Sequence, residues 1–153
     1  MQRYREFEHT ADIGVEVYGH TLTELFQNAG YALFDTIADV TTIRPTVTRS
    51  LTITGADPET FLMNWLRELL YLSALHQEVY AEFDIHTLTT DSDVQEQPAS
   101  SEEDAYRLTA SVHGEPLDLD RHRFKAEIKA ITYHQFCVQQ EADQWRARMI
   151  FDV

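Results

Sequence analysis

Two aspartates differ from the other acidic residues in their positions along the chain. Asp12 lies in a short polar stretch, His9–Gly14, and Asp152 is the penultimate residue, directly after the apolar run Met149–Phe151. A hydrophobic strand that holds the end of the chain can bring the Asp152 side chain and the terminal carboxylate of Val153 to one place. Hard divalent cations bind clustered oxygen ligands of this kind. The pattern therefore indicates a candidate metal site, although composition alone favours exposed turn residues, or an Asp12 that caps its own loop.

The other residues with reactive side chains form no recognisable catalytic pattern. Cys137 lies in an alternating segment, which predicts a buried small hydrophobe rather than a nucleophile. The histidines lack the spacing of metal ligands, so each is interpreted singly as structural or exposed: His9, His20, His76, His86, His113, His122 and His134. The phosphate-loop, dinucleotide-binding, GxSxG and HExxH motifs do not occur in the sequence.

Net charge narrows the classes of partner. Twelve Lys and Arg residues against 26 Asp and Glu residues give a formal net charge of −14. Proteins that bind nucleic acids or anionic membranes neutralise phosphates with basic side chains, and here the basic residues are not gathered in the sequence. Strong direct binding to nucleic acid or membrane is therefore not expected, and cations or basic protein surfaces are the favoured partners.

The sequence predicts the number of domains and the compartment of the cell in which the protein is found. One cysteine excludes an internal disulfide framework. The chain has no apolar run of transmembrane length, and no apolar segment follows the first arginines as in a signal peptide. We therefore expect a single cytoplasmic domain over residues 1–153. The acidic stretch 91–104, with six acids and no bases, is predicted to be a solvated loop or hairpin tip.

Two helices and seven strands are predicted from the apolar spacing. Thr21 and Glu24 form a capping box before an apolar stripe that reaches Ile37. Asp57 and Pro58 begin a second helix, in which Trp65 and Tyr71 are expected to pack in the core. Alternating segments predict strands near residues 4–9, 15–19, 47–54, 79–90, 105–114, 127–139 and 145–151. This order predicts an α+β domain with a largely antiparallel sheet, and the repeated helix–strand order is compatible with a duplicated strand–helix–strand unit.

Three motifs, in this order, carry a resemblance to the archease family. They are HTADIG at His9–Gly14, EIKAITYH at Glu127–His134 within the longer stretch that begins at Gly114, and FDV at Phe151–Val153. The helical segment LFQNAGYALFD and the stretch WLRELLY are also similar to this family. The resemblance covers the whole chain except the acidic stretch 91–104, whose role stays open.

The resemblance implies a non-enzymatic protein cofactor. Archeases activate RtcB-type RNA ligases in tRNA splicing and RNA repair, and they promote histidine guanylylation and multiple turnover of the ligase. By the family pattern, a divalent metal ion, calcium or another hard cation such as Mg²⁺ or Mn²⁺, is held by Asp12, Asp152 and Val153. The functional lysine of the family is matched by Lys129, which spacing alone would make a solvent-facing strand residue paired with Glu127.

Alternatives remain open at this stage. A small metal-dependent hydrolase could use Asp12 and Asp152 with His9 or His134 to activate a water molecule, and a general binding module could recognise basic protein surfaces. Arg121 and His122 are secondary site candidates, and their simpler interpretation is a loop that forms salt bridges to the acidic body of the protein. The sequence determines neither the identity of the metal nor the oligomeric state.

Overall fold

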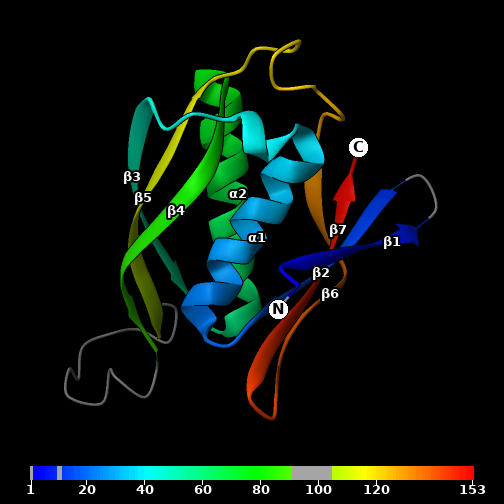
Figure 1. The fold of residues 1–153 in the computed structure, drawn as a ribbon. Helices are drawn as coiled ribbons and strands as arrows, with labels where there is room; N and C mark the ends of the chain where they lie inside the picture. Colours follow the sequence, from blue (N-terminus) through cyan, green and yellow to red (C-terminus); the bar gives the residue numbers. More distant parts are fainter. Residues whose placement is uncertain (1, 10–11, 91–104) are drawn as a thin grey trace.

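The computed structural model describes residues 2–9, 12–90 and 105–153 and has the predicted order of elements (Figure 1). The strands are β1 (Tyr4–His9), β2 (Asp12–Gly19), β3 (Val47–Gly55), β4 (Glu78–Thr89), β5 (Tyr106–Pro116), β6 (Ala130–Glu141) and β7 (Gln144–Asp152). The helices are α1 (Leu22–Ile37) and α2 (Pro58–His76), with a short 3-10 helix, η1 (Val40–Thr42), after α1. The predicted loop at 91–104 lies outside the described residues.

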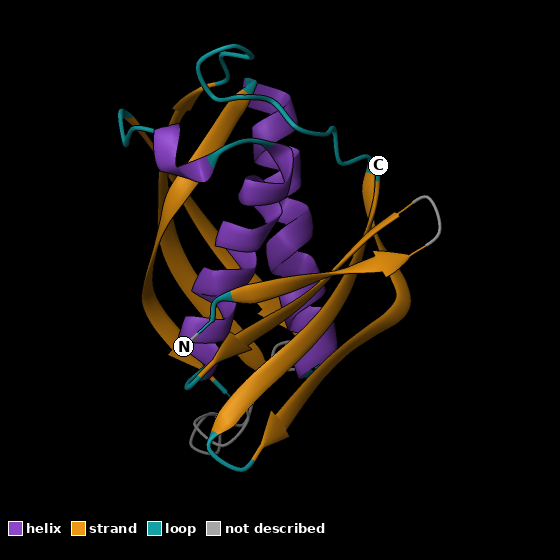
Figure 2. Cartoon of the chain, turned by 45° about the vertical axis from the view of Figure 1, so that its right-hand side comes forward, coloured by secondary structure: helices purple, strands orange, loops and turns teal. Residues whose placement is uncertain are grey.

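The strands form two antiparallel sheets, whereas the sequence analysis expected one. One sheet has the order β1-β2-β7-β6 and the other β3-β5-β4. Figures 1 and 2 show α1 and α2 lying between the two sheets, so that the domain has three layers. The α+β class and the antiparallel pairing are confirmed. Alternation reveals which face of a strand is apolar but not which strand is its neighbour, so the division into two sheets was not predictable from it. The duplication remains a hypothesis.

Both helices begin at the predicted caps. The Thr21 hydroxyl accepts a hydrogen bond from the Glu24 main-chain N–H at 3.1 Å, and the Asp57 carboxylate accepts one from the Thr60 N–H at 2.7 Å. Each bond satisfies one of the donors that the first turn of a helix leaves without a partner. Helix α2 ends at His76 and is capped by Gln77, which adopts a left-handed conformation with φ 55°.

The helices and the inner faces of both sheets share one apolar core. Trp65 is fully buried, and its indole N–H donates to the Phe26 carbonyl oxygen at 2.9 Å, as expected for a core residue. The prediction for Tyr71 is wrong: its exposed fraction is 58 %, and that of Leu75, one turn further on, is 57 %. A helix that is largely apolar still has a side that neither sheet covers, and hydropathy alone does not identify that side. No helix in the described residues is long and apolar enough to cross a membrane.

Candidate functional site

Strand pairing brings Asp12 and Asp152 together at one end of the four-stranded sheet. Asp12 is the first residue of β2 and Asp152 the last residue of β7, and the antiparallel register places them directly opposite each other. Side chains at opposed positions lie on the same face of a sheet, with Cβ atoms about 4.5–5.5 Å apart. Two carboxylates that are 140 positions apart in the sequence therefore become neighbours.

The two carboxylates lie on the face of the sheet that points away from the helices. Val15 and Phe151 are fully buried and belong to the apolar core. Because side chains alternate along a strand, Asp12 and Asp152 project to the opposite face. Both aspartates are half-buried. The end of β7 is fixed because Phe151 packs in the core on one face of the sheet, while the Asp152 carboxylate remains accessible on the other face.

A glycine allows an aromatic ring to cover the sheet next to this pair. A Cβ atom at Gly14 would lie 2.3 Å from the ring of Phe7, so only glycine leaves room for that ring. The Arg148 guanidinium lies 4.2 Å from the centroid of the same ring. Ile150, which pairs with Gly14, is fully buried although it does not belong to the main core. Phe7 and Ile150 both pair with Gly14 and therefore lie on the same face of the sheet as the two carboxylates.

Lys129 immediately precedes β6 and is bonded to the end of β7. Its main-chain N–H donates to the Asp152 carbonyl oxygen at 2.8 Å, and the next residue, Ala130, pairs with Asp152. The side chain is exposed. It lines a groove of about 540 Å³ that is also bordered by Arg67, Tyr71 and Glu127. The alternating pattern predicted that Lys129 lies inside a strand, but the strand begins one residue later.

The two histidines proposed for a hydrolase lie on the strands on either side of this pair. His9 ends β1, and its backbone pairs with that of Asp12. His134 is exposed and lies where the register of β6 and β7 shifts between Thr132 and Cys137, next to Gln135 with φ 56°. The residue on β6 that faces Asp152 is Ala130, four positions before His134. The β6 register thus gives His134 no cross-strand position opposite Asp152.

The donors available to a metal ion at this site are oxygens. In the described part of the chain, no group of three or more His, Cys, Asp and Glu side chains is arranged to hold a metal ion. Asp12 and Asp152 contribute two carboxylates, and Val153, which packs partly buried against the core, adds main-chain oxygens at the same strand end. This donor set fits a hard cation such as Ca²⁺, Mg²⁺ or Mn²⁺, which also accepts water ligands. It does not fit a soft metal that prefers sulfur or nitrogen ligands.

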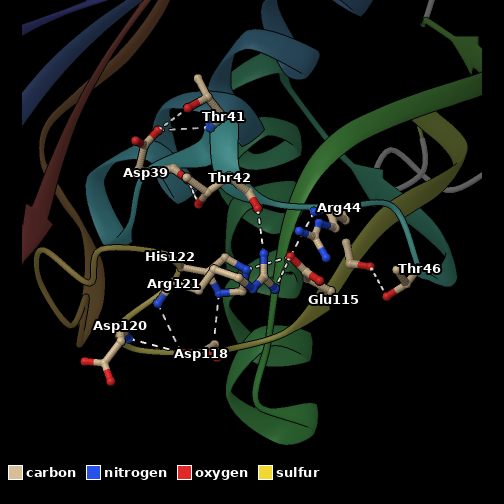
Figure 3. A network of polar contacts seen from close by, with 11 residues as sticks. Asp39, Thr41, Thr42, Arg44, Thr46, Glu115, Asp118, Asp120, Arg121 and His122 are labelled. Atoms are coloured by element: carbon tan, nitrogen blue, oxygen red, sulfur yellow. Dashed lines mark hydrogen bonds and ion pairs between the residues drawn. The ribbon is translucent and has the colours of Figure 1, made fainter.

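Arg121 and His122 belong to a different, buried cluster centred on Glu115 (Figure 3). The Glu115 Oε1 atom accepts from the Arg44 main-chain N–H at 2.9 Å, from the Arg121 guanidinium at 2.6 Å and from His122 Nε2 at 2.7 Å. Burial alone would raise the pKa of Glu115, but these hydrogen bonds lower it to about 2. Arg121 also donates to the Thr42 carbonyl oxygen at 3.0 Å. The interpretation of this stretch as a salt-bridged loop is confirmed.

Sequence reasoning did not identify Glu115. It lies near the end of β5, between a glycine and a proline in a turn-like context, and this context resembles that of an exposed acid. In the structure its exposed fraction is 6 %. The signal that could have found it is the run of basic and histidine residues at 121–123, because such a run needs an acidic partner when a loop packs inward.

The comparisons with known proteins agree with the motifs. The profile of the Archease protein family (MTH1598/TM1083) matches residues 4–153. The protein is 35 % identical to the Protein archease of Pyrococcus abyssi over 154 residues, covering 100 % of both chains. It is 36 % identical to that of Methanosarcina acetivorans over 152 residues, covering 99 % of this chain and 97 % of the relative.

Two solved structures share the fold. The solution structure of Methanobacterium thermoautotrophicum protein 1598 superposes with a TM-score of 0.80 at 28 % identity, covering 100 % of both chains. The crystal structure of an archease, described as a possible chaperone, from Thermotoga maritima gives 0.62 at 18 % identity, covering 97 % of this chain and 96 % of the other, and supports the fold alone. Together with the three ordered motifs, the match to the family profile over residues 4–153 and the full-length sequence matches show that the chain belongs to the archease family.

Proposed function

We propose that this protein is a non-enzymatic activator of an RtcB-type RNA ligase in tRNA splicing or RNA repair. Its role is to promote guanylylation of the ligase and multiple turnover. Family membership over the full chain supports the partner. The observation that carries the choice of site is the pairing of Asp12 with Asp152 at the end of the sheet, where the Asp152 carbonyl oxygen also holds the main chain of Lys129.

The proposed metal ligands are Asp12, Asp152 and the main-chain oxygens of Val153. Calcium is the preferred candidate, and Mg²⁺ and Mn²⁺ are the other cations that this donor set accepts. A bound cation would offset the repulsion between the two carboxylates and supply positive charge at the surface of an acidic protein. The protein's own contribution is to fix the two strand ends through the packing of Phe151 and the register of β2 with β7.

Lys129 is proposed as the residue that reaches the partner's nucleotide. Its main chain is held by Asp152, while its side chain is exposed and has the length and charge to contact a phosphate group. The net charge of −14 disfavours RNA as a direct ligand. The same charge favours docking at the edge of an RNA-binding groove, whose surface must be basic.

The test is ligation by the cognate ligase with GTP and Mn²⁺, with the RNA ends in excess over the ligase. Addition of the protein should raise multiple-turnover ligation and the rate at which the ligase–guanylate intermediate forms. Asp12→Asn and Asp152→Asn should each remove this stimulation. Asp84→Asn is the matched control, because that carboxylate is 63 % exposed and lies on the other sheet.

The outcomes separate the competing functions. Unchanged ligation over a range of protein-to-ligase ratios contradicts the proposal. Hydrolysis of phosphodiester or nucleotide substrates by the protein alone, lost in the same aspartate variants, would instead support the metal-dependent hydrolase. Equal, salt-sensitive binding to unrelated basic proteins would support a general binding module.

A further inference from the structure

The hydrogen bonds of Glu115 hold the segment of the chain that ends at Lys129. Residues 117–129, called here the anchor segment, form turns and extended backbone between β5 and β6. Glu115 lies just before this segment, and two of its three hydrogen-bond donors, Arg121 and His122, lie within it. The third donor is the main chain of Arg44, between η1 and β3. One buried carboxylate therefore ties the anchor segment to both β5 and the connection after α1.

The hydrogen bonds of His122 define its protonation state. The Asp118 main-chain N–H donates to His122 Nδ1 at 2.9 Å, so Nδ1 is the nitrogen without a proton. Nε2 therefore carries the proton and donates it to Glu115 at 2.7 Å. The imidazole is neutral, and both of its nitrogens are satisfied although the side chain is fully buried. A ring turned over by 180° would lose both hydrogen bonds, so these bonds favour one orientation of the ring.

A chain of main-chain bonds continues from this cluster to the candidate site. The Asp39 N–H donates to the His122 carbonyl oxygen at 2.8 Å, and the Lys125 N–H donates to the Ile37 carbonyl oxygen at 2.7 Å. Ile128 is buried in the core, and the Lys129 N–H reaches the Asp152 carbonyl oxygen at 2.8 Å. The anchor segment is thus attached to the end of α1 and then to the end of β7.

The buried charge of Glu115 is better explained by a role in fixing the position of the anchor segment than by a contribution to the stability of the fold. Well-packed apolar residues often replace buried ion pairs without loss of stability, whereas removal of one partner leaves an unpaired buried charge. A fully satisfied polar cluster permits one arrangement of the segments that supply its donors. In this protein two of the donors, Arg121 and His122, belong to the anchor segment, whose last residue is Lys129.

We propose that Glu115 and His122 are positioning residues that hold the anchor segment so that Lys129 lies beside Asp152. This inference rests on the proposed function, because it assigns the two residues to the same site. Without the cluster, the arrangement in which Lys129 is bonded to Asp152 would become only partly populated. Apparent affinity for the ligase falls in proportion to the population of the competent state, while activity at saturation is kept.

The test uses Glu115→Gln and the pair His122→Leu and His122→Gln. Glu115→Gln removes the charge that pairs with Arg121, and His122→Leu removes both bonds of the imidazole. His122→Gln retains an N–H donor for Glu115 and is the conservative variant. The matched control is Glu78→Gln, because Glu78 is also buried and accepts two hydrogen bonds from Arg49, but it joins β4 to β3.

Two readouts distinguish positioning from general destabilisation. The first is amide hydrogen exchange of Lys129, measured on the free protein. The second is the protein concentration that gives half-maximal stimulation of the ligase, compared with the plateau at saturation. Glu115→Gln and His122→Leu should each accelerate exchange at Lys129 and raise the half-maximal concentration about tenfold, with the plateau retained. His122→Gln should bring the exchange rate at Lys129 and the half-maximal concentration most of the way back to the wild-type values. Glu78→Gln should leave these two quantities unchanged.

The inference is overturned if exchange at Lys129 is as slow in Glu115→Gln and His122→Leu as in Glu78→Gln. It is also overturned if all variants lower stability and stimulation in parallel. Failure of the proposed function has a different result, since the wild-type protein would then not stimulate the ligase at all. The exchange measurement on the free protein decides the positioning role in that case as well.

Discussion

Replacement of Asp152 by asparagine should have opposite effects on the metal-free and the metal-loaded protein. Asp12 and Asp152 occupy opposed positions on neighbouring strands. Charges about 5 Å apart repel by about 0.8 kcal/mol even at the dielectric constant of water, and like charges at such cross-strand positions cost roughly 0.2–1 kcal/mol. Asp152→Asn removes this repulsion. For a domain of this size we expect the melting temperature of the chelator-treated protein to rise by about 1–4 °C.

The same substitution should abolish stabilisation by a cation. A ligand present at 100 times its dissociation constant stabilises the folded state by about 2.7 kcal/mol, which corresponds to a rise of roughly 5–10 °C in the melting temperature. The wild-type protein should show this rise with Ca²⁺, and Asp152→Asn should not. The assay is thermal unfolding in a chelator and then in a series of Ca²⁺ concentrations.

The control for this experiment is Glu82→Gln, which removes one unit of negative charge from an exposed residue of the other sheet. It separates the local repulsion from the effect of a lower net charge. An Asp152→Asn variant that is less stable than wild type without metal would refute the repulsion argument. A variant that Ca²⁺ stabilises as strongly as wild type would refute the assignment of the ligands.

Other substitutions test other parts of the structure. Lys129→Ala should lower the plateau of ligase stimulation and change stability by less than about 0.5 kcal/mol, because the side chain is exposed; ligation and thermal unfolding measure the two effects. Gly14→Ala should cost about 1–3 kcal/mol in denaturant unfolding, since its methyl group would overlap the Phe7 ring. A glycine–serine extension after Val153 should weaken Ca²⁺ stabilisation relative to the same extension at the N-terminus. The pKa of Glu115, about 2 in the folded protein against an ordinary 4.5, predicts that its contribution to stability is complete above about pH 4.5 and is lost as the pH falls toward 2; in Glu115→Gln this part of the acid-unfolding curve should be flatter.

Local sequence signals were sufficient for the elements and their order. The Thr21 cap and the Asp57–Pro58 helix start act through bonds within three residues, so they can be inferred without knowing the fold. The division of the strands into two sheets depends on pairings between distant segments, such as β2 with β7. Hydrophobic alternation carries no information about those partners. The exposed position of Tyr71 was missed because hydropathy does not identify the side of α2 that neither sheet covers.

The candidate site was predictable only in part. Asp12 and Asp152 were selected from their positions in the chain and Lys129 from the family motifs, and the register of β2, β7 and β6 places these distant residues at one end of the sheet. Glu115 could not be selected, because its burial arises from the packing of residues 117–129 onto β5 and the end of α1. His122 was selected, but its neutral, fully bonded state follows from two partners that the sequence alone does not identify.

The most direct test of the central claim is multiple-turnover RNA ligation by the cognate RtcB-type ligase, with wild-type protein and with Asp152→Asn. The proposed mechanism predicts strong stimulation by the wild-type protein and none by the variant at equal folded concentration. Equal stimulation by both proteins would contradict the role of the paired carboxylates. Absence of stimulation by the wild-type protein would contradict the assignment as a ligase activator.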